Sequence, residues 1–87
     1  MPERVYVNVT SDFDRTGYMQ PRLITWPDGR VFRIDEVRAF RPAGAGALRD
    51  CYTVVIQGEE RYLYYERPTE LHPSRFGRWF VQSAESA

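Results

Sequence analysis

The sequence predicts an all-β fold, a six-stranded antiparallel meander that curls into one small, partly open barrel. Short segments rich in β-branched and aromatic residues alternate between apolar and polar side chains, and turn residues interrupt them about every ten positions. No segment has the spacing of an amphipathic helix. The 87 residues suffice for one domain, which we expect over residues 1–82, with a flexible tail over residues 83–87.

The composition is that of a folded, soluble domain without a cofactor. Hydrophobic residues make up 43% and aromatic residues 15% of the chain, and large rings supply the buried area that a small core needs. One cysteine excludes an internal disulfide, and one histidine beside it leaves too few ligands for a zinc site. No apolar run approaches the ~18 residues of a membrane span, and Pro2-Glu3-Arg4 begins no signal peptide. We therefore expect a cytoplasmic protein that makes no membrane contact.

The first two strands and their connection follow from alternation and turn residues. Over residues 3–10, valines occupy every second position and share one face: Val5, Val7 and Val9. A turn-rich segment at residues 12–17 leads to a second strand, which begins at residue 19 or 22 and ends at Trp26.

A hairpin is predicted at Trp26-Pro27-Asp28-Gly29. Proline presets φ at the second position of a type I turn, and Asp28 suits the third. Gly29 supplies the left-handed residue of a G1 bulge, so that the chain returns at Arg30.

The returning strand, residues 31–40, changes phase along its length. Phe32 and Ile34 share a face, whereas Val37 and Ala39 stand at odd positions. One residue must therefore be absorbed near residues 35–36, which predicts a β-bulge and a sharp bend.

The second half of the chain continues the meander. A mobile loop is predicted at residues 42–47, where two glycines and a proline break the pattern. Strands follow at residues 51–56 and 61–66 around a tight turn, and a short last strand is predicted at residues 79–82. An SH3-like barrel is the nearest familiar architecture.

The segment W-P-D-G-R-V-F-R-I-D-E-V, residues 26–37, resembles a motif of small uncharacterised bacterial proteins, W-x-D-G-R-x-aromatic-x-I-D-x-V. The likeness continues at Arg41-Pro42-Ala43, Tyr52-Thr53 and Trp79-Phe80-Val81, and covers about residues 12–81. The resemblance implies one shared fold. It implies no activity, because the group has none established.

The residues argue against an enzyme. Cys51 and His72 are the one thiol–imidazole pair, but Cys51 begins a core strand and His72 precedes a proline in a surface loop. Paired carboxylates, such as Asp12 with Asp14, lack a pocket that would separate their pKa values. Gly44-x-Gly46 precedes a strand, whereas glycine loops that bind phosphate precede a helix.

Arginine is concentrated in the middle of a chain whose net charge is zero. All 12 basic residues are arginine, and the charge is −2 over residues 1–14, +4 over residues 15–49 and −2 over residues 50–87. Guanidinium groups bind carboxylates and phosphates and stack on rings. The alternative interpretation is that these arginines pair across the sheet with Glu59, Glu60 and Glu66.

We therefore predict a non-catalytic binding or accessory module. Its site joins the outward side of residues 30–41 to the loop at 44–49 and to the tyrosine strand, with the candidates Arg30, Arg33, Arg38, Arg41, Arg49, Tyr62, Tyr64 and Trp79. The expected partner is another protein. The alternative is single-stranded nucleic acid, although zero net charge is not typical of such proteins. Open sheet edges also offer a route to self-association.

Overall fold

Seven strands form one antiparallel sheet in the order β3-β2-β1-β7-β6-β5-β4. The strands are β1 (Arg4–Phe13), β2 (Met19–Thr25), β3 (Val31–Arg33), β4 (Glu36–Ala43), β5 (Arg49–Ile56), β6 (Glu59–Glu66) and β7 (Arg78–Gln82). The structure is a computed structural model that describes residues 4–44, 46, 48–68 and 77–82. His72 and the predicted tail at residues 83–87 lie outside the described residues. The described residues include no helix that is long and apolar enough to cross a membrane.

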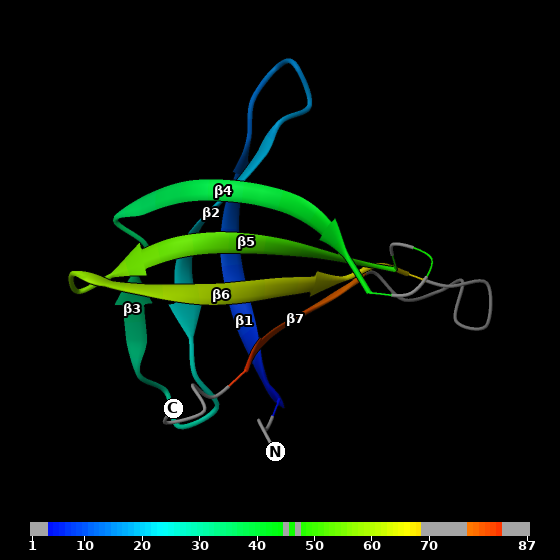
Figure 1. Ribbon diagram of the computed structural model, residues 1–87. Coiled ribbons are helices and arrows are strands. Elements are labelled where there is room, and N and C mark those ends of the chain that lie inside the picture. The colour runs from blue at the N-terminus through cyan, green and yellow to red at the C-terminus, as the bar shows by residue number, and fades with distance from the viewer. Residues whose placement is uncertain (1–3, 45, 47, 69–76, 83–87) are drawn as a thin grey trace.

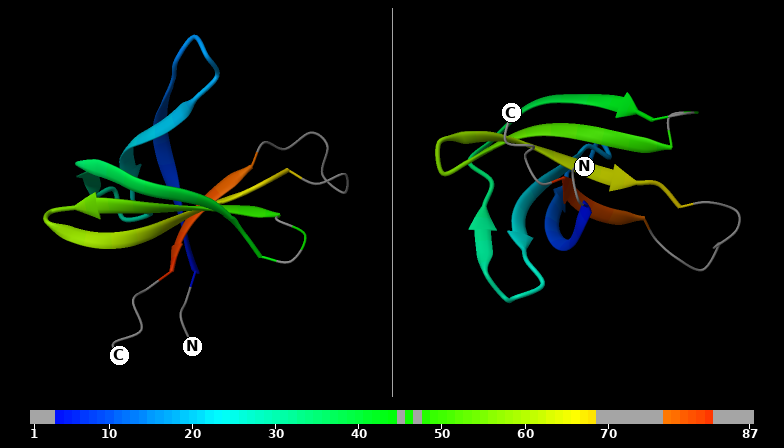
Figure 2. Two further views of the ribbon diagram at one scale, coloured as in Figure 1. Left: turned by 45° about the horizontal axis from the view of Figure 1, so that its top comes forward. Right: turned by 60° about the horizontal axis from the view of Figure 1, so that its bottom comes forward.

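The sheet curls because β1 belongs to both of its halves. Its first residues pair with β7, and from Asn8 onward it pairs with β2, with a register shift between Thr10 and Ser11. Strands β4, β5 and β6 therefore lie across β1, β2 and β3, as Figures 1 and 2 show. The predicted all-β, antiparallel, partly open barrel is confirmed as a half-barrel.

The core lies on the concave, inner face of this curl. Alternating residues of the strands meet there, together with Ile34, which lies between β3 and β4. The buried members of the core are Val7, Ile24, Ile34, Tyr52, Val54, Leu63 and Val81. Burial of such side chains is the main favourable term in folding.

The prediction of six strands is wrong because the segment 31–40 forms two strands. β3 ends at Arg33 and β4 begins at Glu36, and the two strands lie at opposite edges of the sheet. The change of phase in the sequence thus marks the segment where the chain crosses from one edge of the sheet to the other. The β-bulge comes later than predicted, between Val37 and Ala39.

Two backbone hydrogen bonds hold this crossing in place. The Ile34 N–H donates to the Arg22 carbonyl of β2 at 2.8 Å, and the Asp35 N–H donates to the Val55 carbonyl of β5 at 2.8 Å. Asp35 Oδ2 also accepts a bond of 3.2 Å from the Gln57 N–H, in the turn between β5 and β6. The crossing therefore joins elements from both halves of the barrel.

The predicted hairpin turn is confirmed. The Gly29 N–H donates to the Trp26 carbonyl at 2.9 Å, and the Trp26 N–H donates to the Arg30 carbonyl at 2.8 Å. Gly29 has φ of 94°, the left-handed conformation that a G1 bulge requires. The loop predicted at residues 42–47 begins later, because β4 continues through Ala43. Pro42 is compatible with an edge strand, since its missing N–H removes no bond from the interior of the sheet.

We predict that Ile34→Ala lowers the free energy of unfolding by about 2–5 kcal/mol, because Ile34 is only 5% exposed and closes the core. Val31→Ala, in the adjacent strand at 57% exposure, is the control and changes stability by less than about 0.5 kcal/mol. Urea denaturation of both variants measures the difference. Equal effects would show that the crossing does not depend on burial of Ile34.

Candidate functional site

The outer face of the sheet carries a row of side chains that crosses five strands. The register aligns Tyr6 of β1, Phe80 of β7, Tyr64 of β6, Cys51 of β5 and Arg41 of β4. Residues directly opposite one another in an antiparallel sheet project to the same side. Side chains from both ends of the chain are thus brought together.

A second row lies beside the first on the same face. It aligns Arg78 of β7, Glu66 of β6, Arg49 of β5 and Ala43 of β4. Glu66 therefore stands between two arginines, and Arg49 lies one row away from Tyr64.

Phe80 is fully buried although it lies on the outer face. Its ring stacks on Tyr64 with a centroid distance of 5.0 Å and an angle of 12°, and the Tyr6 ring lies 5.5 Å away. The Arg4 guanidinium carbon covers the Phe80 ring at 4.6 Å. These four side chains form a small packed cluster on the outer surface of β1, β7 and β6.

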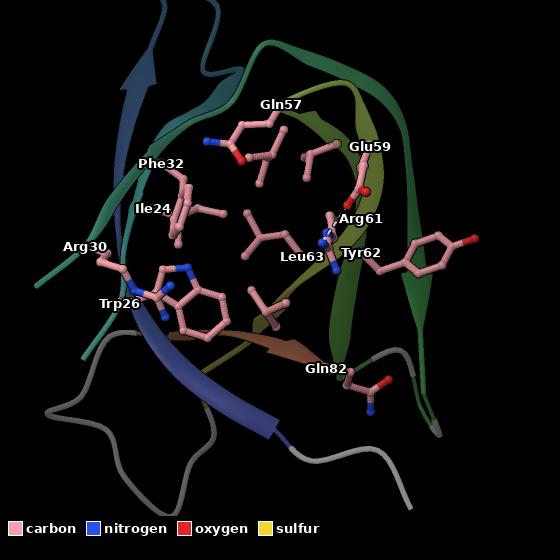
Figure 3. A pocket seen from close by; sticks show the side chains of 13 residues that line it. Ile24, Trp26, Arg30, Phe32, Gln57, Glu59, Arg61, Tyr62, Leu63 and Gln82 are labelled. Carbon is pink, nitrogen blue, oxygen red and sulfur yellow. Dashed lines mark hydrogen bonds and ion pairs between the residues drawn. The ribbon is translucent and has the colours of Figure 1, made fainter. Parts of the chain in front are cut away.

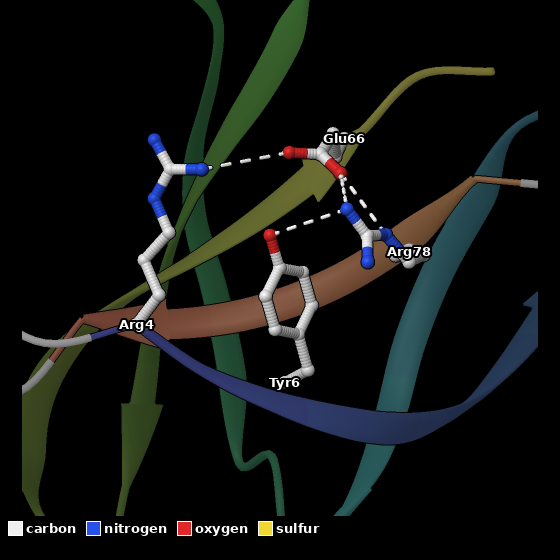
Figure 4. A network of polar contacts seen from close by, with 4 residues as sticks. All are labelled: Arg4, Tyr6, Glu66 and Arg78. Carbon is white, nitrogen blue, oxygen red and sulfur yellow. Dashed lines mark hydrogen bonds and ion pairs between the residues drawn. The ribbon is translucent and has the colours of Figure 1, made fainter. Parts of the chain in front are cut away.

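Charged groups close the edge of this cluster, as Figure 4 shows. The Arg78 guanidinium donates to Glu66 Oε1 at 2.6 Å and to the Tyr6 hydroxyl at 3.4 Å. Arg4 Nη1 lies 3.6 Å from Glu66 Oε2. The bond to Glu66 raises the pKa of Arg78, partly opposed by burial. Glu66 is therefore shared between two guanidinium groups and fixes both.

We name Arg38, Arg41, Arg49, Tyr62 and Tyr64 the outer arginine–tyrosine face. Five of the eight residues predicted for the site thus lie on the outer side of β4, β5 and β6, and Arg38 reaches this side through its bond to Glu60. Tyr62 is 49% exposed, whereas Tyr64 is partly covered by its stacking on Phe80.

The arginines of this face differ in their partners. Arg38 donates to Glu36 at 3.0 Å and to Glu60 at 3.3 Å, and the bond to Glu36 is the main cause of its raised pKa. Among the residues that the structure describes, Arg41 and Arg49 form no ion pair. Gly44 makes room for Arg49, because a Cβ at that position would lie 2.9 Å from its Nε.

The other three predicted residues lie elsewhere. Arg30 donates to Asp28 at 2.7 Å beside the hairpin turn, and Arg33 lies on edge strand β3. The Trp79 ring faces inward, where it packs against Tyr52 at 5.4 Å and Tyr65 at 4.8 Å. Periodicity alone did not locate the Trp79 ring, because periodicity does not say which face of the last strand is covered by the core.

The alternative interpretation, that arginines pair across the sheet with glutamates, is confirmed for some of these residues. Glu60 binds Arg38 and Glu66 binds Arg4 and Arg78, while Glu59 is held by Arg61 of its own strand. The sequence interpretation did not include Arg4, Tyr6 and Arg78 in the site. One feature of the sequence could have indicated them, because these charged and aromatic side chains alternate with the core-facing residues of β1 and β7.

The sheet edges oppose further strand pairing. β4 carries its bulge between Val37 and Ala39 and contains Pro42, and β3 has only three residues. Bulges, prolines and short edge strands are the devices by which proteins prevent edge-to-edge association.

The titratable groups with shifted pKa values have structural causes. The hydrogen bond from the Thr16 hydroxyl is the main cause of the lowered pKa of Asp14. The hydrogen bond from the Arg30 backbone N–H is the main cause of the lowered pKa of Asp28. Within the described part of the chain, no three His, Cys, Asp or Glu side chains are grouped so as to hold a metal ion.

No family model, curated protein or solved structure matches this chain. The resemblance of the Trp26 hairpin to a bacterial group stays a prediction, and the geometry is the basis for a functional proposal.

Burial raises the pKa of Tyr64, with Cys51 adding to the rise and the charges of Arg41 and Arg49 opposing it. Because the pKa is higher in the folded state, the unfolded chain ionises first as the pH rises. The contribution of the neutral Tyr64 hydroxyl to the free energy of unfolding is therefore fully present below about pH 10, and it is lost as the pH rises further.

We predict that the free energy of unfolding falls less steeply above about pH 10 in Tyr64→Phe than in the unmodified chain. Urea denaturation between about pH 9 and pH 11 measures the slope. Tyr62→Phe removes the same hydroxyl from the exposed ring and serves as the control. An unchanged slope in Tyr64→Phe would contradict the prediction.

Proposed function

We propose that this chain is a non-catalytic binding module that contacts an acidic surface of a partner protein through the outer arginine–tyrosine face. The observation that carries the proposal is the position of Arg41 and Arg49 beside Tyr64. Neither forms an ion pair among the residues that the structure describes, because Glu66, which lies opposite Arg49, is bound to Arg4 and Arg78. A carboxylate of a partner would satisfy guanidinium donors of Arg41 and Arg49, which form no ion pair within the described part of the chain.

The types of residue support a protein partner. Arginine and tyrosine are enriched at protein interfaces and at the positions that contribute most to affinity. A guanidinium binds a carboxylate through two parallel hydrogen bonds, which fixes the orientation of the partner as well as its charge. The exposed Tyr62 ring adds apolar contact area next to these charges.

The contacts that hold Tyr64 and Glu66 in place support the same proposal. Tyr64 is held by stacking on Phe80, and Arg4 and Arg78 hold the neighbouring Glu66. A surface that is ordered before binding loses less conformational entropy when the partner docks. The partner therefore meets a preformed platform.

Single-stranded nucleic acid is the second candidate. Tyr62 and Tyr6, at 49% and 38% exposure, offer ring surface near arginines. Proteins of this kind stack successive bases on aromatic side chains along a positive groove. Tyr64 is already stacked on Phe80 and Trp79 faces inward, so fewer rings are free, and we favour the protein partner.

We predict that reversing two charges abolishes binding of the partner. The full chain and Arg41→Glu/Arg49→Glu are immobilised and used to capture proteins from a bacterial extract. The control is Arg15→Glu/Arg33→Glu, which changes the net charge equally at exposed positions off this face. Capture by the unmodified chain and the control, but not by the double variant, supports the proposal.

A partner retained equally by all three proteins would overturn the assignment of this face. In parallel, a single-stranded oligonucleotide is titrated at low and high salt. A salt-dependent mobility shift that Arg41→Glu/Arg49→Glu abolishes would support the nucleic-acid candidate in place of the protein partner.

A further inference from the structure

A cavity of about 350 Å³ opens at the end of the half-barrel, on the inner face, and it shares with the outer arginine–tyrosine face one residue, Tyr62. Figure 3 shows the apolar side chain of Leu63 at its centre and that of Ile24 beside Phe32 at one wall. Its volume lies near the lower end of the ~300–1,000 Å³ found for small-molecule sites.

Aromatic rings form one wall of the cavity. Trp26 and Phe32 meet edge to face, with a centroid distance of 6.3 Å and an angle of 84°. The Arg30 guanidinium carbon lies 6.0 Å from the Trp26 ring and 5.7 Å from the Phe32 ring. The hairpin turn thus places two rings and a cation on one side of the opening.

Polar groups surround the opening rather than the floor. Tyr62 and Gln82 belong to the lining, but their side chains point away from it, as Figure 3 shows. The side chains left to meet a ligand are those of Arg30, Arg61 and Glu59, together with Gln57.

Hydrogen-bond donors are in excess at this opening. Arg61 Nη2 donates to Glu59 at 2.7 Å, and Arg30 Nε donates to Asp28 at 2.7 Å. Each carboxylate is therefore paired with one guanidinium, whereas each guanidinium has five N–H groups. Within the described residues, the remaining N–H groups of Arg61 and the indole N–H of Trp26 have no acceptor.

We propose that this cavity binds a small carboxylic acid with an apolar or aromatic body. The body replaces water over the apolar floor and against the Trp26 ring, where burial of apolar surface contributes to affinity. The carboxylate accepts hydrogen bonds from Arg61 at the opening, and Arg30 adds a second positive charge nearby. An amine of the same shape would bring a third positive charge beside Arg30 and Arg61, and the Glu59 carboxylate is already paired with Arg61.

The test is a ¹H–¹⁵N NMR titration of the full chain with 3-phenylpropionate. The matched probes are 3-phenylpropanol and 3-phenylpropylamine, which keep the ring and the chain but change the head group. We expect the acid to shift the Trp26 indole N–H and the Arg61 side-chain N–H. We also expect the acid to bind roughly tenfold more tightly than the alcohol.

Arg61→Met weakens binding of the acid roughly tenfold and leaves binding of the alcohol unchanged. The control is Arg22→Met, because Arg22 has similar side-chain exposure, pairs with Asp12 at 2.8 Å and does not belong to the lining of the cavity. The spectrum of each variant reports whether it is folded.

Three results would overturn the proposal. They are equal binding of all three probes, shifts confined to residues outside the cavity, and no shift up to the solubility limit of the acid. Loss of the protein partner in the outer-face variants is a separate outcome, since those variants leave the cavity intact.

Discussion

The hydrogen bonds of Ile34 and Asp35 connect two strands that are not neighbours in the sheet, β2 and β5. Without this crossing, β3 and β4 would be the free edges of an open sheet, and one face of that sheet would be exposed to water. The crossing brings the edges together, so that Ile34 packs with Val54 and Leu63 in one core. Curvature of the sheet, burial of the core and the separation of two surfaces all follow from it.

The curl gives the two faces of the sheet different properties. The concave face encloses the core and ends in a cavity with an apolar floor and a charged opening. The convex face gathers side chains from β1, β7, β6, β5 and β4 in adjacent rows. Phe80 packs there under Tyr6, Tyr64 and Arg4, which gives the outer surface a small core of its own. The two proposed sites therefore lie on opposite faces of the sheet and share one lining residue, Tyr62, whose ring points away from the cavity.

Local rules of the sequence predicted most of the fold and part of the site. Alternation located the strands, and Pro27, Asp28 and Gly29 defined a turn whose bonds are those expected. The phase change before Val37 was recognised, but a single strand with a bulge and two strands at opposite edges produce the same pattern. Only the ladder registers distinguish them, because they depend on which distant segments pair. For the same reason, the alignment of Arg41 with Tyr64, Phe80 and Tyr6 was not predictable from spacing along the chain.

Native-state amide hydrogen exchange measured residue by residue tests most directly whether the crossing closes the barrel. The account predicts that the Ile34 and Asp35 amides exchange only on global unfolding, at the same free energy as the amide of the fully buried Leu63. Exchange of these two amides by local opening, as fast as the Gly17 amide in the exposed turn between β1 and β2, would contradict it.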